Sequence, residues 1–70
     1  MQPNDMRAEL IRVAEATAAT EDRMAATLEW MAEIRPYHAE RLRALVKAAE
    51  GHAAHMRRWV EACSARPEHR

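Results

Sequence analysis

Large apolar and threonine side chains recur along the first half of the chain at alternating intervals of four and three residues. The positions are Met6, Leu10, Val13, Thr17, Thr20, Met24, Thr27, Met31 and Ile34. The second half repeats the alternation at His38, Leu42, Leu45, Ala49, His52, Met56, Trp59 and Cys63. This spacing is typical of the buried stripe of a coiled-coil helix, and no alternation with a period of two occurs. The pattern predicts an all-α protein with two long helices.

Pro36 separates the two patterned segments, and the other two prolines lie near the chain ends. Proline can begin a helix but disfavours helical geometry in the residue before it, so Arg35 is the expected hinge. We expect one helical domain over residues 1–70. It comprises a first helix over about 5–34 capped by Asn4 or Asp5, a turn at about 35–36, a second helix over about 37–65, and a frayed tail at 66–70. The short turn favours an antiparallel hairpin over one long kinked helix.

The charges of the two segments are opposite. Residues 1–35 carry four Arg and seven acidic residues (net −3), whereas residues 36–70 carry seven basic and four acidic residues (net +3). This asymmetry favours a hairpin, by tenths of a kcal/mol for each exposed pair. The whole chain has zero net charge, so general attraction to nucleic acid or to an anionic membrane is not implied. With no long apolar run and no signal-like start, we expect a cytoplasmic protein without membrane contact.

The chain has few large apolar side chains, because 16 of its 70 residues are alanine. Domains of this size usually need disulfides, a metal or a partner chain, and a single cysteine excludes an internal disulfide. We therefore expect the hairpin to pair into a homodimeric four-helix bundle. Its core seam is predicted at Leu10, Val13, Met24, Leu28, Leu42, Leu45, Met56 and Trp59. The alternative is a three-helix bundle, with the first helix split near Thr20, where Thr20-Glu21-Asp22 resembles a helix start.

The sequence predicts no catalysis and no cofactor. Cys63 has no nearby histidine with an orienting third group, and the chain lacks a glycine-rich phosphate loop. His52 and His55 are spaced i, i+3 and could share a metal with Glu21, although no Glu-x-x-His motif of the di-iron bundles occurs. The favoured role for His52 is a hydrogen bond to Thr17 or Thr20 in a polar middle layer.

Partner binding is the favoured function. Trp30, with Met31 beside it and Arg41 expected opposite, lies on the flank of the predicted stripe, and Trp and Arg are favoured at binding hot spots. The competing role is a cation–π contact between Trp30 and Arg41 within the hairpin. The sequence therefore predicts a non-catalytic protein-interaction module: an adaptor, inhibitor or regulator that binds itself and another protein. Abundant alanine and ten Arg against one Lys are typical of a bacterial or phage gene rich in G and C.

Two alternative functions follow from other residues. Arg43, Lys47, Arg57 and Arg58 could contact phosphates in a nucleic-acid-binding regulator. Its architecture would be analogous to the dimeric helical hairpin ROP, although no sequence match to ROP exists and a shared fold does not imply a shared function. The second alternative is a metal-binding bundle built on the histidines.

Overall fold

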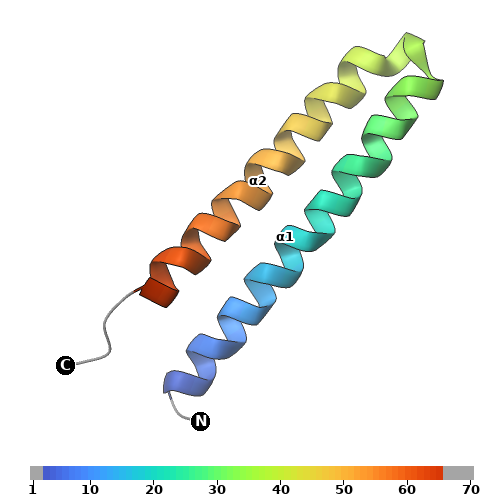
Figure 1. Ribbon diagram of the computed structural model, residues 1–70. Coiled ribbons are helices and arrows are strands. Elements are labelled where there is room, and N and C mark those ends of the chain that lie inside the picture. Colours follow the sequence, from blue (N-terminus) through green and yellow to red (C-terminus); the bar gives the residue numbers. More distant parts are fainter. Residues whose placement is uncertain (1–2, 66–70) are drawn as a thin grey trace.

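Two antiparallel α-helices joined by a short turn form the described part of the molecule. The computed structural model describes residues 3–65. Helix α1 spans Pro3–Ile34, a 3-10 helix (η1) spans Pro36–His38, and helix α2 spans Ala39–Ala65. The helices lie side by side along their length, so that the start of α1 and the end of α2 are at the same end (Figure 1). The predicted all-α hairpin is confirmed.

The turn is built from the residues around Pro36. Arg35 has a non-helical backbone (φ −130°, ψ 72°), in keeping with the bias against helical geometry before proline. Its N–H still donates to the carbonyl of Met31 at 2.9 Å, and its own carbonyl accepts from the N–H of His38 at 2.9 Å. The chain therefore reverses through a single non-helical residue, without glycine. The first turn of the predicted second helix is 3-10, α1 begins two residues earlier than predicted, and the tail at 66–70 lies outside the described residues.

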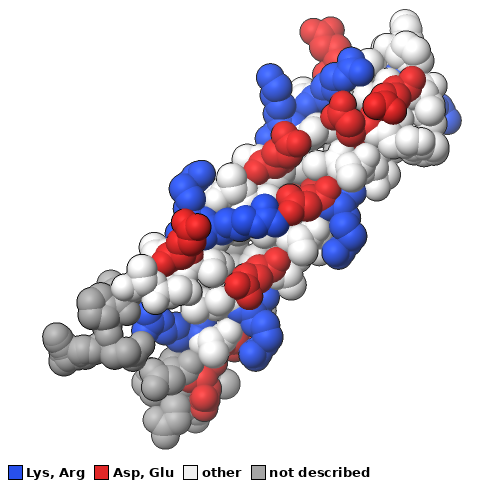
Figure 2. Space-filling model, viewed as in Figure 1, with Lys and Arg blue, Asp and Glu red and all other residues white. Residues whose placement is uncertain are grey.

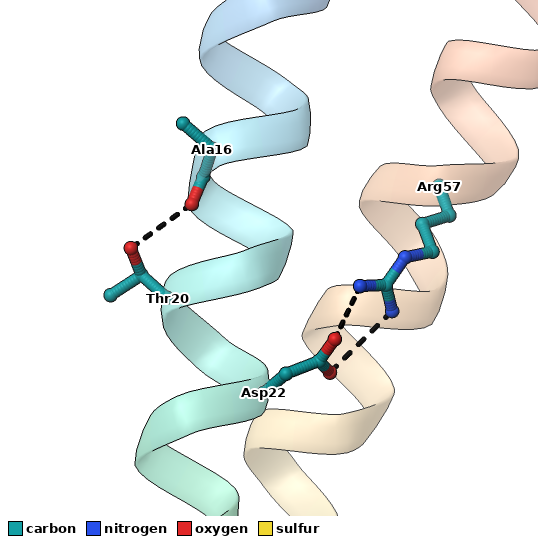
Figure 3. A network of polar contacts seen from close by, with 4 residues as sticks. All are labelled: Ala16, Thr20, Asp22 and Arg57. Carbon is teal, nitrogen blue, oxygen red and sulfur yellow. Dashed lines mark hydrogen bonds and ion pairs between the residues drawn. The ribbon is translucent and has the colours of Figure 1, made fainter.

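Both helices are continuous where the sequence suggested a break. The Thr20 hydroxyl donates to the carbonyl of Ala16, one turn earlier, at 3.0 Å (Figure 3). A threonine used in this way stays inside a helix instead of capping a new one. Gly51 likewise lies within α2. The three-helix alternative is therefore not the observed fold.

The contact line between the helices is made mainly of alanine. The residues with the smallest exposed fractions, none above 6%, are Ala14, Ala18, Ala25, Ala32, Val46, Ala49 and Ala53. Leu28 packs against the cluster of Ala25, Val46 and Ala49. Small side chains allow two helix backbones to approach closely. At the open end, the Arg7 guanidinium donates to the backbone carbonyl of Cys63 and so ties the start of α1 to α2.

The hairpin is a single layer. Its Cα atoms extend over 55 × 19 × 11 Å. Stable domains normally pack two layers of secondary structure around a core. In a two-helix layer only the line between the helices is shielded, so side chains on the two broad faces remain accessible. The two faces of this hairpin differ sharply in chemistry.

Candidate functional site

One broad face carries most of the exposed large apolar side chains. We define this apolar face by Met6, Leu10, Val13, Thr17, Met24 and Met31 of α1 and by Leu45, Ala48, His52, His55 and Trp59 of α2. Among them Leu10, Val13, Met24, Leu45 and Trp59 are 38–53% exposed. These five belong to the predicted seam, whereas the other seam residues, Leu28, Leu42 and Met56, are half-buried.

The contact line is displaced from the predicted stripe. On α1 it runs one residue later, through Ala18, Ala25 and Ala32, and on α2 it includes Val46 and Ala53. The reason is steric, because alanines allow a closer approach of the helices than the methionines and threonines of the predicted stripe. The predicted stripe of α1 therefore flanks the contact line on the apolar face.

Two shallow apolar hollows lie on this face. The first, of about 320 Å³, is lined by Leu10, Val13, Ala14, His55, Met56 and Trp59. The second, of about 400 Å³, is lined by Glu21, Met24, Leu28, Leu45, Ala48, Ala49 and His52. Both hollows are lined by side chains of α1 and of α2. The face thus offers two apolar depressions, one toward the open end of the hairpin and one toward the turn.

A polar pair lies at mid-length of the apolar face. His52 Nδ1 and the Glu21 carboxylate are 2.9 Å apart, and the Glu21 side chain is only 20% exposed. The sequence instead suggested Thr17 or Thr20 as the partner of His52. Glu21 is the partner because the displaced contact line brings it to the edge of α2. The pair is an ion pair whenever His52 is protonated.

The opposite face is charged. Arg57 donates through both terminal guanidinium nitrogens to the two carboxylate oxygens of Asp22 (Figure 3). Closer to the turn, Arg43 Nε lies 3.9 Å from the Glu29 carboxylate. Figure 2 shows acidic and basic side chains interspersed over both helices. These cross-helix pairs join the acidic segment to the basic one, as the charge asymmetry of the sequence suggested.

The contact between Asp22 and Arg57 shifts the pKa of both side chains. The hydrogen bond from Arg57 lowers the pKa of Asp22 below its ordinary value of 3.8; desolvation opposes this shift, and the guanidinium charge adds a smaller lowering effect. The pKa of Arg57 is raised in turn, first by the hydrogen bond to Asp22 and then by its charge. Both side chains are about half exposed, so this pair positions the helices more than it stabilises them.

The metal-binding candidates do not form a ligand set. His52 pairs with Glu21, while His55 lines the hollow near Trp59. Within residues 3–65, no group of three or more His, Cys, Asp or Glu side chains is placed to hold a metal ion.

The basic candidates for nucleic-acid binding lie among acids. Arg57 is engaged by Asp22, and Arg43 lies near Glu29. Lys47 and Arg58 are exposed. Their surface also carries Glu40, Glu50 and Glu61, all exposed. The four basic residues therefore do not form a continuous positive patch.

Trp30 and Arg41 lie on opposite edges of the hairpin. Trp30, 59% exposed, is two positions from both Leu28 and Ala32 and therefore lies on the side of α1 away from α2. Arg41 is exposed on α2, beside Tyr37 and His38 near the turn. Among the described side chains, these two form no cation–π contact. Met31 is half-buried on the apolar face.

The chain matches no protein-family model, no curated protein and no solved structure. In the described part of the chain, neither helix is both long and apolar enough to cross a membrane.

Proposed function

We propose that this chain is a small non-catalytic protein-interaction module that works as a homodimeric helical bundle. The observation that supports the proposal most directly is the distribution of apolar side chains. The contact line inside the hairpin consists of six alanines and one valine, and none of the larger apolar side chains is fully buried. Most of the exposed larger side chains lie on one face. An exposed apolar face of this kind is typical of a protein–protein interface.

The exposed area of the molecule agrees with a missing partner. The 8.0 kDa chain exposes 5531 Å². A compact monomer of this mass exposes about 4,500 Å², so this hairpin has a surplus of about 1,000 Å². Each partner in an interface of standard size loses about 800 Å² of exposed surface. The surplus is therefore of the size that one dimer contact removes.

The surface proposed for a further protein lies at the turn end. Trp30, Met31 and Arg41 supply an aromatic ring, a flexible thioether and a guanidinium, the side chains that recur at binding hot spots. Tyr37, 94% exposed, extends this surface to the tip. The homodimer would present two such surfaces, one on each edge.

Sedimentation equilibrium and thermal melting over a range of protein concentrations test the proposal. We expect a dimer of ~16 kDa, twice the mass of the chain, with a melting temperature that rises with concentration because association is linked to folding. A cooperative monomer whose melting does not depend on concentration contradicts it. A parallel titration with RNA and DNA separates the proposal from the nucleic-acid alternative, which requires binding that weakens steeply with salt.

A further inference from the structure

Two copies of the apolar face can be stacked with two-fold symmetry in two ways. If the axis runs along the hairpin, both turns lie at the same end, and α1 of each copy packs across α2 of the other. If the axis runs across the hairpin, the turns lie at opposite ends, and each helix packs across its own counterpart. The two arrangements bring different side chains together.

The pairs of side chains at each level of the apolar face fit the arrangement with both turns at one end. Leu10 and Trp59 line the same hollow, and Met24 and Leu45 line the other, so each pair lies at one level of the hairpin. Exchanging α1 and α2 between copies therefore places leucine against tryptophan and methionine against leucine. It also places His52 of each copy near Thr17 of the other. The opposite arrangement instead places His52, the central residue of α2, against itself.

The charges of the helices favour the same arrangement. Helix α1 carries seven acidic and three basic residues, a net charge of −4, and α2 carries five basic and three acidic residues, a net charge of +2. With the turns together, each acidic helix faces a basic one both within its hairpin and across the interface. With the turns apart, α1 faces α1, and the like charges repel.

Trp30 and Arg41 provide a third, independent argument. They lie on opposite edges of one hairpin, near the turn, and cannot meet within it. A second copy with its turn at the same end brings its α2 across α1, and therefore its Arg41 to the edge that carries Trp30. A guanidinium over an indole ring is a favourable cation–π arrangement.

Given the proposed homodimer, on which this inference rests, we infer that the occupant of the apolar face is a second copy with its turn at the same end. Each edge of the dimer then combines Trp30 of one copy with Arg41 of the other, while Met31 of the apolar face lies between the copies. The surface proposed for a further protein is thus built by two chains and is incomplete in the monomer.

Distances between spin labels test the arrangement. Cys63→Ala removes the native thiol, and Tyr37→Cys at the exposed tip of the turn provides one labelling site. With the turns together, the two labels lie about 20 Å apart, roughly two helix diameters. With the turns apart, they approach the 55 Å length of the molecule. Ala54→Cys, exposed and near mid-length, is the control that reports dimer formation in either arrangement.

The outcomes separate this inference from the proposed homodimer. A short distance between labels at position 37 supports both the homodimer and the arrangement with the turns together. A distance that approaches the 55 Å length of the molecule overturns the arrangement and leaves the homodimer standing, because the two turns then lie at opposite ends. No dipolar coupling at either position, with helicity retained, means a monomer and overturns both.

A double-variant cycle tests the shared edge. Trp30→Ala and Arg41→Ala should each raise the dimer Kd about tenfold, because each removes the same contact at both edges. The double variant should be no weaker than either single variant. Effects that multiply in the double variant mean that the two side chains do not meet, and the shared edge is then wrong.

Discussion

Truncating Leu45 measures how much the apolar face contributes to association. Complete burial of a leucine side chain contributes ~2 kcal/mol. Leu45 is 49% exposed in the hairpin, so about half of that, ~1 kcal/mol, remains for a partner to supply. A symmetric dimer contains this residue twice. We therefore expect Leu45→Ala to weaken the dimer by about 2 kcal/mol, a rise in Kd of about 30-fold.

The assay is sedimentation equilibrium of both proteins at several concentrations, with circular dichroism recorded on the same samples. Alanine is the best helix former, so α2 should keep its helicity. Lys47→Ala is the matched control, since it shortens an exposed side chain two positions away on the charged face, and its Kd should stay within about twofold of the wild type. Equal dissociation constants for Leu45→Ala and the wild type would refute the assignment of this face.

Three further predictions test the hairpin itself. Gly51→Ala should raise the free energy of unfolding by about 0.5–1 kcal/mol, measured by denaturant unfolding, because an added Cβ meets no atom within 4 Å and alanine is the better helix former. A loss of stability would mean that the space around position 51 is not open. Ala18→Leu, at a position 1% exposed, should lower the free energy of unfolding by about 1–3 kcal/mol because the larger side chain overpacks the contact line. Ala16→Leu, on the exposed side of α1, should change it little. Equal losses for the two variants would contradict the position of the contact line. Because Arg57 lowers the pKa of Asp22 in the folded state, this carboxylate stabilises the fold above its ordinary pKa of 3.8 and ceases to do so as the pH falls through the lowered value. The difference in melting temperature between the wild type and Asp22→Asn should therefore shrink from pH 6 to pH 2, and a difference that does not change with pH excludes this linkage.

The sequence by itself determined the helices and their reversal. The alternating intervals of four and three residues specify long helices, and Pro36 forces a non-helical Arg35 between them. Both features act through local backbone geometry, which a sequence encodes directly. The opposite charges of the two halves similarly anticipated the cross-helix pairs of Asp22 with Arg57 and of Glu29 with Arg43.

Only the tertiary structure decided which stripe lies between the helices. Two adjacent stripes of α1 share the same heptad spacing, one with Leu10, Val13 and Met24, the other with Ala18 and Ala25. Hydrophobicity alone favoured the first. Close packing of two helices favours the second, because small side chains bring the backbones together and place the larger ones beside the contact line. A two-helix layer shields one line only, and so the strongest apolar pattern in the sequence became an exposed face.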